Sequence, residues 1–330
     1  MLARSSKLGQ KFGVNISTPI LVPSFSSKGF KFDKEGKSEI TKIIGVASEW
    51  LTESMLISAF DIHYGYIPKE FNAITELTFI DSGGYEKSDD YDLSTVSITP
   101  PLIQDWNEAI LRDLYNSLPS EFPYVLVNYD YKRPILEQIE NARQFFISYP
   151  QRLHTILLKR EAEEDQYINI KSVLRYVSEL SYFDIIGLTE KELGNSLLNR
   201  MYNIARIRQE LDRNGISSPI HIFGSLDPVT SPLYFLAGAE IFDGLTWLRY
   251  SYLNGIAVYQ HNYGALQTGI SIRDDTAKAK SFVENINYLQ DLKYQMGAYL
   301  LAGDFNKFKF NADFLKISYD ALCTSLGGLV

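Results

Sequence analysis

Three of the predicted β-strands carry an aspartate at or near their end, and these side chains are the best placed for chemistry. Asp81 ends the run TFID, Asp130 ends YVLVNYD, and Asp243 lies in EIFDGL. An inward carboxylate at the end of a buried strand is costly unless it is used or paired, because burying an unpaired charge is strongly unfavourable. Two carboxylates beside a sugar anomeric carbon support glycosyl transfer: one attacks the carbon and the other moves protons on the departing and arriving groups.

Each aspartate also has a structural interpretation. The run SGG at 82–84 follows Asp81; it lets the backbone approach a ligand and offers consecutive N–H donors, but it is also an ordinary turn capped by the aspartate. Asp130, taken alone, is better explained as a cap for the helix predicted to follow it. Asp243 lies within its strand, too early to cap a helix. Its position therefore favours the chemical interpretation.

The elements that must position these residues are eight short, nearly continuous apolar runs, typical of parallel strands buried on both faces. They are ILVPSF (20–25), MLISAF (55–60), TFIDS (78–82), YVLVNYD (124–130), HTILLK (154–159), DIIGLT (184–189), IHIFGS (220–225) and EIFDGL (240–245). Amphipathic helical patterns lie between some of them, at 101–118, 133–150 and 195–215. Strands that alternate with helices imply a parallel sheet, and eight strands predict a closed (β/α)₈ TIM barrel.

After residue 250 the pattern changes to two long helices, 276–303 and 311–328, which we expect to pack on the outside of the barrel. The sequence thus predicts one α/β domain over 1–330, with the barrel at about 14–265 and a C-terminal helical extension at about 270–330. The active site of such a barrel lies at the C-terminal ends of its strands. The residues found there are Asp81, Asp130, Lys159, Gly187, Ser225 and Asp243.

Composition limits the class of protein. Of the 330 residues, 45% are hydrophobic, and 22 Tyr, 19 Phe and 3 Trp supply enough apolar area for a large core, which excludes disorder. The single cysteine, Cys323, excludes a disulfide framework and a cysteine-rich zinc site. Apolar stretches are too short to cross a membrane, and the start MLARSSKLGQKFG lacks a signal core. We expect a soluble, cytoplasmic protein with no membrane partner.

Charge is unevenly distributed along the chain. The formal net charge of −8 excludes a globally basic nucleic-acid coat. Residues 1–42 nevertheless carry an excess of positive charge, with Asp33, Glu35 and Glu39 as their acidic side chains. The basic ones are Arg4, Lys7, Lys11, Lys28, Lys31, Lys34, Lys37 and Lys42. This Lys-rich arm is either a phosphate-facing surface or, more commonly, a solvated and partly mobile terminus.

Five blocks of the sequence together resemble a known family. TPILVPSF (18–25), FIDSGGYE (79–86), YVLVNYD (124–130), DIIGLTEKELG (184–194) and HIFGSLDPVTSPLYFLAGAEIFDGLTWLR (221–249) have the order and approximate spacing found in the tRNA-guanine transglycosylase superfamily. The DSGGY element and the Phe-Asp-Gly strand followed by Arg are the most specific parts. The resemblance covers roughly 14–265. It implies a TIM-barrel glycosyltransferase that exchanges guanine in nucleic acid for a 7-deazaguanine base such as preQ0.

The resemblance assigns roles position by position. Asp243 matches the nucleophile that attacks the ribose or deoxyribose anomeric carbon, and Asp81 matches the general acid/base. Asp130 matches the guanine-reading aspartate, a chemically sound pairing because a carboxylate accepts from both N1–H and N2–H₂ of guanine. The residues implied to shape the base pocket are Ser82, Gly83 and Gly84.

Other matching positions bind rather than react. Gly187 and Leu188 match a backbone segment that lines the exchanged base, and Arg249 matches a basic residue near the nucleic-acid strand. Two departures stand out. Where the family has a glutamine and two glycines, this chain has LLKRE at 157–161, so Lys159 or Arg160 faces the pocket and the incoming base stays open. The residues before Arg249 are Thr-Trp-Leu instead of a proline-containing turn.

A third departure concerns zinc. The transfer-RNA enzymes hold zinc with three closely spaced cysteines and a histidine, whereas YLNGIAVYQHNYG (252–264) has only His261 as a soft ligand. We therefore expect no cofactor and no metal. A zinc-free barrel without an appended RNA-binding domain is more similar to the branch that inserts 7-deazaguanines into DNA. We expect DNA, then transfer RNA, as the polymer, and a protein partner stays open.

The histidines are weaker candidates for chemistry than the three aspartates. His154 and His221 start strands, where structural roles dominate, whereas His63 lies after the second strand and is a weak candidate for stacking on a base.

A first alternative function is an N-glycosidic hydrolase acting on a free nucleoside or nucleotide with the same carboxylates. A second is a non-catalytic partner subunit of a transglycosylase, against which the presence of Asp81, Asp130 and Asp243 together weighs.

Overall fold

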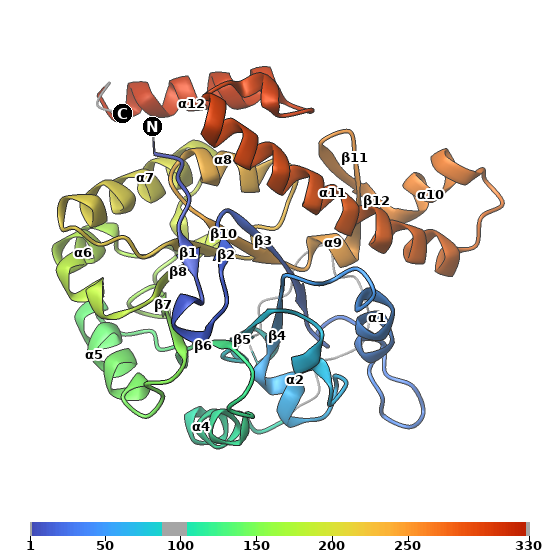
Figure 1. Ribbon diagram of the computed structural model, residues 1–330, viewed down its shortest axis with the longest axis horizontal. Coiled ribbons are helices and arrows are strands. Elements are labelled where there is room, and N and C mark those ends of the chain that lie inside the picture. The colour runs from blue at the N-terminus through green and yellow to red at the C-terminus, as the bar shows by residue number, and fades with distance from the viewer. Residues whose placement is uncertain (1, 88–103, 328–330) are drawn as a thin grey trace.

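Eight parallel strands close into a barrel in the order β10-β3-β4-β5-β6-β7-β8-β9 in the computed structural model, which describes residues 2–87 and 104–327 (Figure 1). The strands are β3 (Ile20–Phe25), β4 (Ser54–Ser58), β5 (Leu77–Asp81), β6 (Tyr124–Val127), β7 (Leu153–Leu158), β8 (Ile185–Thr189), β9 (Ile220–Phe223) and β10 (Ile241–Gly244). All eight predicted runs form these strands, and the (β/α)₈ prediction is confirmed. The largest boundary error is at β6, which ends at Val127, three residues before Asp130.

The barrel strands are buried on both faces because successive side chains alternate between its interior and the helical layer. The interior forms one apolar cluster, which includes Val22, Phe79, Leu157 and Ile241. The alternate positions belong to a second and larger cluster between the barrel and the helices, which includes Leu188. This alternation decides which strand-end side chains face the mouth of the barrel.

Helices surround the barrel as the alternating pattern predicts. They include α1 (Glu39–Ala47), α2 (Ala59–His63), α3 (Gly84–Lys87), α4 (Glu108–Ser117), α5 (Ile135–Phe146), α6 (Ile170–Arg175), α7 (Leu197–Arg213), α8 (Thr230–Leu236) and α9 (Thr246–Arg249). The helix predicted at 101–118 begins at Glu108, where the Asn107 side chain accepts a hydrogen bond from the Ile110 N–H and caps it. Residues 101–103 of that prediction lie outside the described residues.

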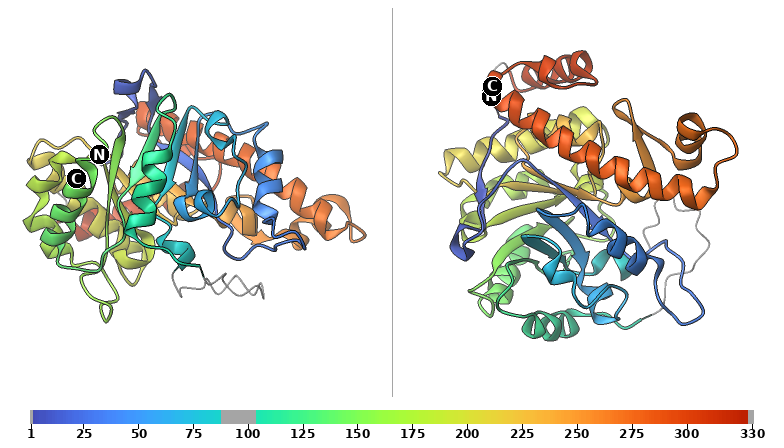
Figure 2. Two further views of the ribbon diagram at one scale, coloured as in Figure 1. Left: turned by 90° about the horizontal axis from the view of Figure 1, so that it is seen from below. Right: turned by 45° about the vertical axis from the view of Figure 1, so that its right-hand side comes forward.

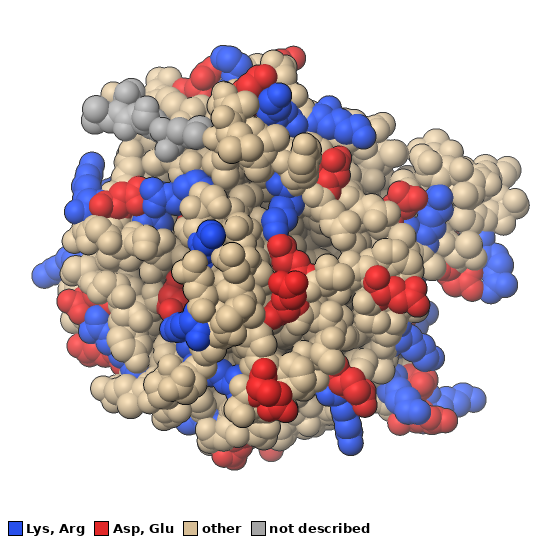
Figure 3. Space-filling model, in the orientation of Figure 1, with Lys and Arg blue, Asp and Glu red and all other residues tan. Residues whose placement is uncertain are grey.

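The first part of the N-terminal segment, residues 2–17, packs against the barrel. Its antiparallel strands β1 (Lys7–Leu8) and β2 (Ile16–Ser17) cover the end of the barrel where the strands begin (Figure 2). Leu8 and Ile16 pack into the interior cluster. Arg4 and Lys11 pair with Asp212 and Asp184 at 2.6 and 2.9 Å. Basic and acidic side chains are interspersed over this end (Figure 3), so the local excess of lysine in the sequence does not become a basic surface here.

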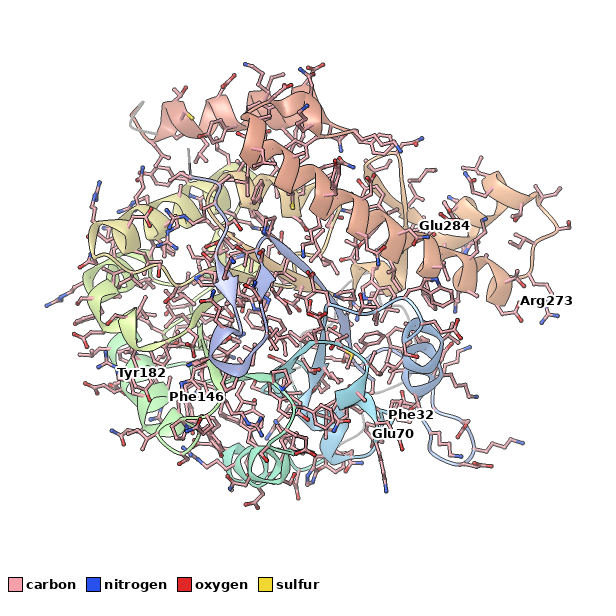
Figure 4. The ribbon with its side chains drawn as sticks, in the orientation of Figure 1. Phe32, Glu70, Phe146, Tyr182, Arg273 and Glu284 are labelled. Carbon is pink, nitrogen blue, oxygen red and sulfur yellow. The ribbon has the colours of Figure 1, made fainter. Side chains whose placement is uncertain are left out.

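The chain after β10 builds a lobe beside the barrel. The antiparallel pair β11 (Tyr250–Leu253) and β12 (Ile256–Tyr259) leads into α10 (Gln260–Thr268) and the long α11 (Asp274–Ala302), followed by α12 (Ala312–Ser325). Arg273, at the start of α11, lies at the outer edge of this lobe (Figure 4). The predicted C-terminal helices are confirmed on the outside of the barrel. None of the helices in the described ranges is both long and apolar enough to cross a membrane.

Candidate active site

Asp81 and Asp243 face the interior of the barrel at its C-terminal end. Each lies two residues after a member of the interior cluster, Phe79 on β5 and Ile241 on β10, so alternation turns both carboxylates inward. At the C-terminal ends of these strands, Gly244 of β10 pairs in register with Pro23 of β3. Asp81 of β5 pairs in the same way with Ser58 of β4. The barrel therefore brings two carboxylates that are far apart in the chain to one mouth.

The carboxylate of Asp243 is nearly buried and is held by three polar groups. The Ser24 hydroxyl on β3 donates to Oδ2 at 2.8 Å, and the Gly224 N–H donates to Oδ1 at 3.3 Å. His221 Nε2, on β9, lies 3.0 Å from Oδ1. These three contacts fix the orientation of the carboxylate, and Asp243 is 5% exposed.

Asp81 lies in a different electrostatic environment. Burial raises the pKa of Asp81 well above its usual value, and the negative charges of Asp130, Glu86 and Asp243 raise it further. Lys159 opposes this effect. The site thus holds one carboxyl group whose pKa is raised by burial and neighbouring negative charges, and a second carboxylate that is surrounded by hydrogen-bond donors. Two carboxyl groups in such different environments suit different roles in acid–base and nucleophilic chemistry.

The turn after Asp81 is built for close approach. Gly83 has φ of +84°, and a Cβ there would lie 2.6 Å from Trp106 Nε1, which donates to the Ser82 carbonyl at 2.8 Å. A Cβ on Gly84 would lie 2.6 Å from Asp130 Oδ2. The Ser82 hydroxyl donates to Asp130 Oδ1 at 2.6 Å. Glycine is therefore required at 83 to pack the turn against Trp106 and at 84 to bring it against Asp130. Asp130 does not cap the following helix as its position in the sequence suggests, since Pro134 is the N-cap residue.

Lys159 lies beside Asp130. Its Nζ is 3.5 Å from Asp130 Oδ2 and 3.8 Å from Glu192 Oε1, and it donates to Thr189 Oγ1 at 3.0 Å. Burial disfavours the charge, but Asp130, Glu192 and Asp81 outweigh it and raise the pKa of Lys159. The pocket therefore presents a fixed ammonium donor beside a carboxylate acceptor.

Gly187 and Leu188 occupy opposite faces of β8. A Cβ on Gly187 would lie 2.7 Å from the Phe223 ring, so glycine leaves room for that ring inside the barrel. The Leu188 side chain is fully buried in the outer cluster and does not face the mouth. Only its backbone is available there.

Arg249 lies at the rim, where its Nη2 donates to the Tyr85 hydroxyl at 2.9 Å. Lys28 is buried close by: its ammonium donates to the Tyr85 carbonyl at 2.6 Å and lies 4.5 Å from the centre of the Tyr85 ring. The sequence grouped Lys28 with the exposed lysines of the arm. The structure instead assigns it to the wall of the site.

Sequence reasoning missed two buried carboxylates and a histidine. Asp61 accepts from the N–H and hydroxyl of Ser27, and Glu86 accepts from Ser26 and Ser58. Burial raises the pKa of both carboxyl groups. A usable signal existed, because Asp61 follows a predicted strand as Asp81 does. His221, for which a structural role was expected, contacts Asp243.

The lobe does not fit the zinc site that the resemblance implies for transfer-RNA enzymes. His261 is exposed on α10 and stacks on Tyr259, whereas Cys323 lies on α12. Within the described ranges, His, Cys, Asp and Glu do not gather into any group of three that could bind a metal. Asn285 instead links α11 to the backbone at 247–252. Its side chain donates to the Trp247 and Tyr250 carbonyls and accepts from the Tyr252 N–H.

Comparison with known proteins does not identify a family for this chain. No model of a protein family matches the chain, and a search of curated proteins finds no similar sequence. The chemical interpretation therefore rests on the residues at the mouth of the barrel.

Proposed function

We propose that this protein is a glycosyltransferase that exchanges guanine in a nucleic acid for a 7-deazaguanine base through a covalent intermediate on Asp243. One observation carries the proposal. Asp81 and Asp243 face one mouth, where burial and neighbouring charges raise the pKa of the first while hydrogen-bond donors surround the second. Such a pair supplies the acid and the nucleophile of a retaining glycosyl transfer.

The exchange consists of two displacements at C1′ of the sugar. A lone pair of Asp243 forms a bond to C1′ as the C1′–N9 bond breaks, and the departing guanine takes a proton from Asp81. The incoming base then returns a proton to Asp81 and attacks C1′, which releases the Asp243 carboxylate. In each step one bond to C1′ forms as another breaks and one proton is transferred, so the enzyme returns to its starting state.

The pair formed by Asp130 and Lys159 supports a 6-oxopurine as the base. The Asp130 carboxylate can accept from N1–H and N2–H₂ of guanine, while the Lys159 ammonium can donate to O6. Adenine would direct its 6-amino donor at an ammonium that cannot accept a hydrogen bond. The 7-substituent of the incoming base is not specified by these two residues.

The polymer must present its base outside a duplex, because C1′ of a stacked nucleotide cannot reach Asp243. Lys31, Lys34 and Lys37, in the exposed loop after β3, lie on the mouth side of the barrel together with Arg249. We favour DNA over transfer RNA because the segment that holds zinc in transfer-RNA enzymes here forms the β11–β12 pair and α10 without cysteines.

The test is incorporation of labelled guanine into single-stranded DNA, into transfer RNA and into free deoxyguanosine, with Asp243→Ala as the control. We expect label in DNA and none with the variant. Incorporation into RNA alone would reverse the choice of polymer. Release of guanine from the nucleoside without exchange would establish the hydrolase alternative instead. No reaction with any substrate would favour the non-catalytic partner subunit.

A further inference from the structure

His221 is a buried hydrogen-bond partner of Asp243, and it has no role in the two displacements proposed above. It lies on β9, paired in register with Ile241 of β10, and its side chain is fully buried inside the barrel. The imidazole stacks on Phe223 with ring centres 3.9 Å apart, and the Phe79 ring meets it edge-on at 5.6 Å. Two aromatic rings therefore fix its plane, with Nε2 directed at Asp243 Oδ1.

The hydrogen-bond partners assign the tautomer of this histidine. Nε2 must carry the proton, because an ionised carboxylate can only accept. Nδ1 is buried without a hydrogen-bond partner in the described structure. A second proton on Nδ1 would bury an unpaired N–H among aromatic rings, which is unfavourable. The geometry therefore assigns His221 Nε2–H as the donor to Asp243 Oδ1.

The donors are distributed unequally over the two carboxylate oxygens. Each oxygen has two in-plane lone pairs. Both lone pairs of Oδ1 are used, by His221 Nε2–H and by the Gly224 N–H, whereas Oδ2 accepts only from the Ser24 hydroxyl. Among the described residues, the lone pair that remains free belongs to Oδ2.

We infer that His221 is a positioning residue that holds Oδ1 of Asp243 and so presents the free lone pair of Oδ2 to the sugar carbon. This inference rests on the proposed function. As Oδ2 bonds to C1′ and the C1′–N9 bond breaks, Oδ1 becomes the carbonyl oxygen of the ester and can still accept from His221. The same hydrogen bond therefore holds the carboxylate before attack and the ester afterwards.

The test compares two replacements of His221. His221→Phe keeps a flat ring against Phe223 but removes the donor, whereas His221→Gln keeps an N–H donor at about the distance of Nε2. We expect His221→Phe to slow formation of the covalent adduct with guanine-containing single-stranded DNA by about 10–100-fold, as for a misoriented reacting group. Binding of free guanine, measured by calorimetry, should change less than about twofold, and His221→Gln should recover most of the rate.

His154 provides the matched control. It is also a buried histidine on a barrel strand, but its ring stacks on Phe146 and Tyr182, and its Nε2 lies 2.8 Å from the Tyr149 carbonyl. Phe146 and Tyr182 lie together on the outside of the barrel (Figure 4). His154→Phe should leave adduct formation unchanged. Equal rates for wild type and His221→Phe, or no recovery in His221→Gln, would overturn the inference.

A second measurement separates this inference from the proposed function. Nitrogen NMR of histidine-labelled protein should show a protonated Nε2 and an unprotonated Nδ1 for His221, with the Nε2 signal changed by Asp243→Asn. The opposite tautomer, or a doubly protonated ring, would overturn the inference even if base exchange occurs. Absence of an adduct in the wild type, with the expected NMR spectrum, would instead refute the proposed function.

Discussion

The two ends of the last barrel strand carry carboxylates with opposite surroundings. Glu240, just before β10, accepts from Ser6 and Thr18 hydroxyls at 2.6 and 2.8 Å and is completely buried beneath the β1–β2 pair. Asp243, three residues later, accepts from Ser24 and Gly224 but opens to the mouth. The same side-chain chemistry is thus closed off at one end of the barrel and accessible at the other.

The difference separates stability from reactivity. Burial raises the pKa of Glu240, and both hydroxyl donors reach the same oxygen, Oε1, while Oε2 is buried without a hydrogen-bond partner among residues 2–87 and 104–327. Glu240 therefore serves mainly to attach the N-terminal segment to the barrel. Asp243 has donors on both oxygens and is 5% exposed, and it is the residue that we propose as the nucleophile. Four experiments test this contrast.

The largest expected effect is on chemistry at the open end. Asp243→Asn should abolish the covalent adduct and reduce base exchange by about 10⁴-fold or more, because loss of a covalent nucleophile has effects of this size. Mass spectrometry of the quenched reaction measures the adduct. Glu240→Gln is the matched control and should retain exchange. An adduct in Asp243→Asn would place the nucleophile elsewhere.

At the closed end, the expected effect is on folding. Glu240→Ala leaves the Ser6 and Thr18 hydroxyls without their common acceptor, which should lower the free energy of unfolding by about 1–3 kcal/mol. Urea denaturation followed by circular dichroism measures it. The rate of exchange per folded molecule should not change. A variant with normal stability but impaired exchange would contradict the division between the two ends.

The lysines of residues 1–42 lie at both ends of the barrel, and we expect only those on the mouth side to affect binding of single-stranded DNA. Replacing Lys31, Lys34 and Lys37 by Ala should reduce the slope of log K for single-stranded DNA against log salt by about 2, since each lost phosphate contact contributes about 0.7. Lys7 and Lys11 lie at the hairpin end, so Lys7→Ala with Lys11→Ala should leave the slope unchanged. Equal slopes in all three proteins would remove this loop from the binding surface.

The smallest expected effect is a pH dependence of stability. The pKa of Glu240 is raised in the folded protein. As the pH rises, its carboxyl group therefore loses its proton in the unfolded chain before it does so in the folded protein. Stability that is present below pH about 4 is therefore lost as pH rises through the folded-state pKa. Glu240→Gln cannot titrate, so relative to wild type it should gain stability between pH 4 and 8 in urea unfolding. The other buried carboxyls titrate equally in both proteins. A relative loss would contradict the assignment.

Much of this arrangement could be predicted from the sequence because it depends on local periodicity. Short apolar runs that alternate with amphipathic helices indicate a barrel, and alternation along each strand turns Asp81 and Asp243 inward. The candidate residues at the ends of strands followed from the same rule. Applied consistently, that rule would also have indicated Asp61, which follows β4.

Which of these side chains come into contact depends on how distant parts of the chain pack together. Ser24 and Asp243 are 219 residues apart in the chain, and His221 reaches Asp243 because β9 and β10 pair in a particular register. Barrel closure and register are set by packing between strands distant in sequence, which a local pattern does not contain. For the same reason the sequence grouped Lys28 with the other lysines of residues 1–42, whereas the fold buries its ammonium against Tyr85.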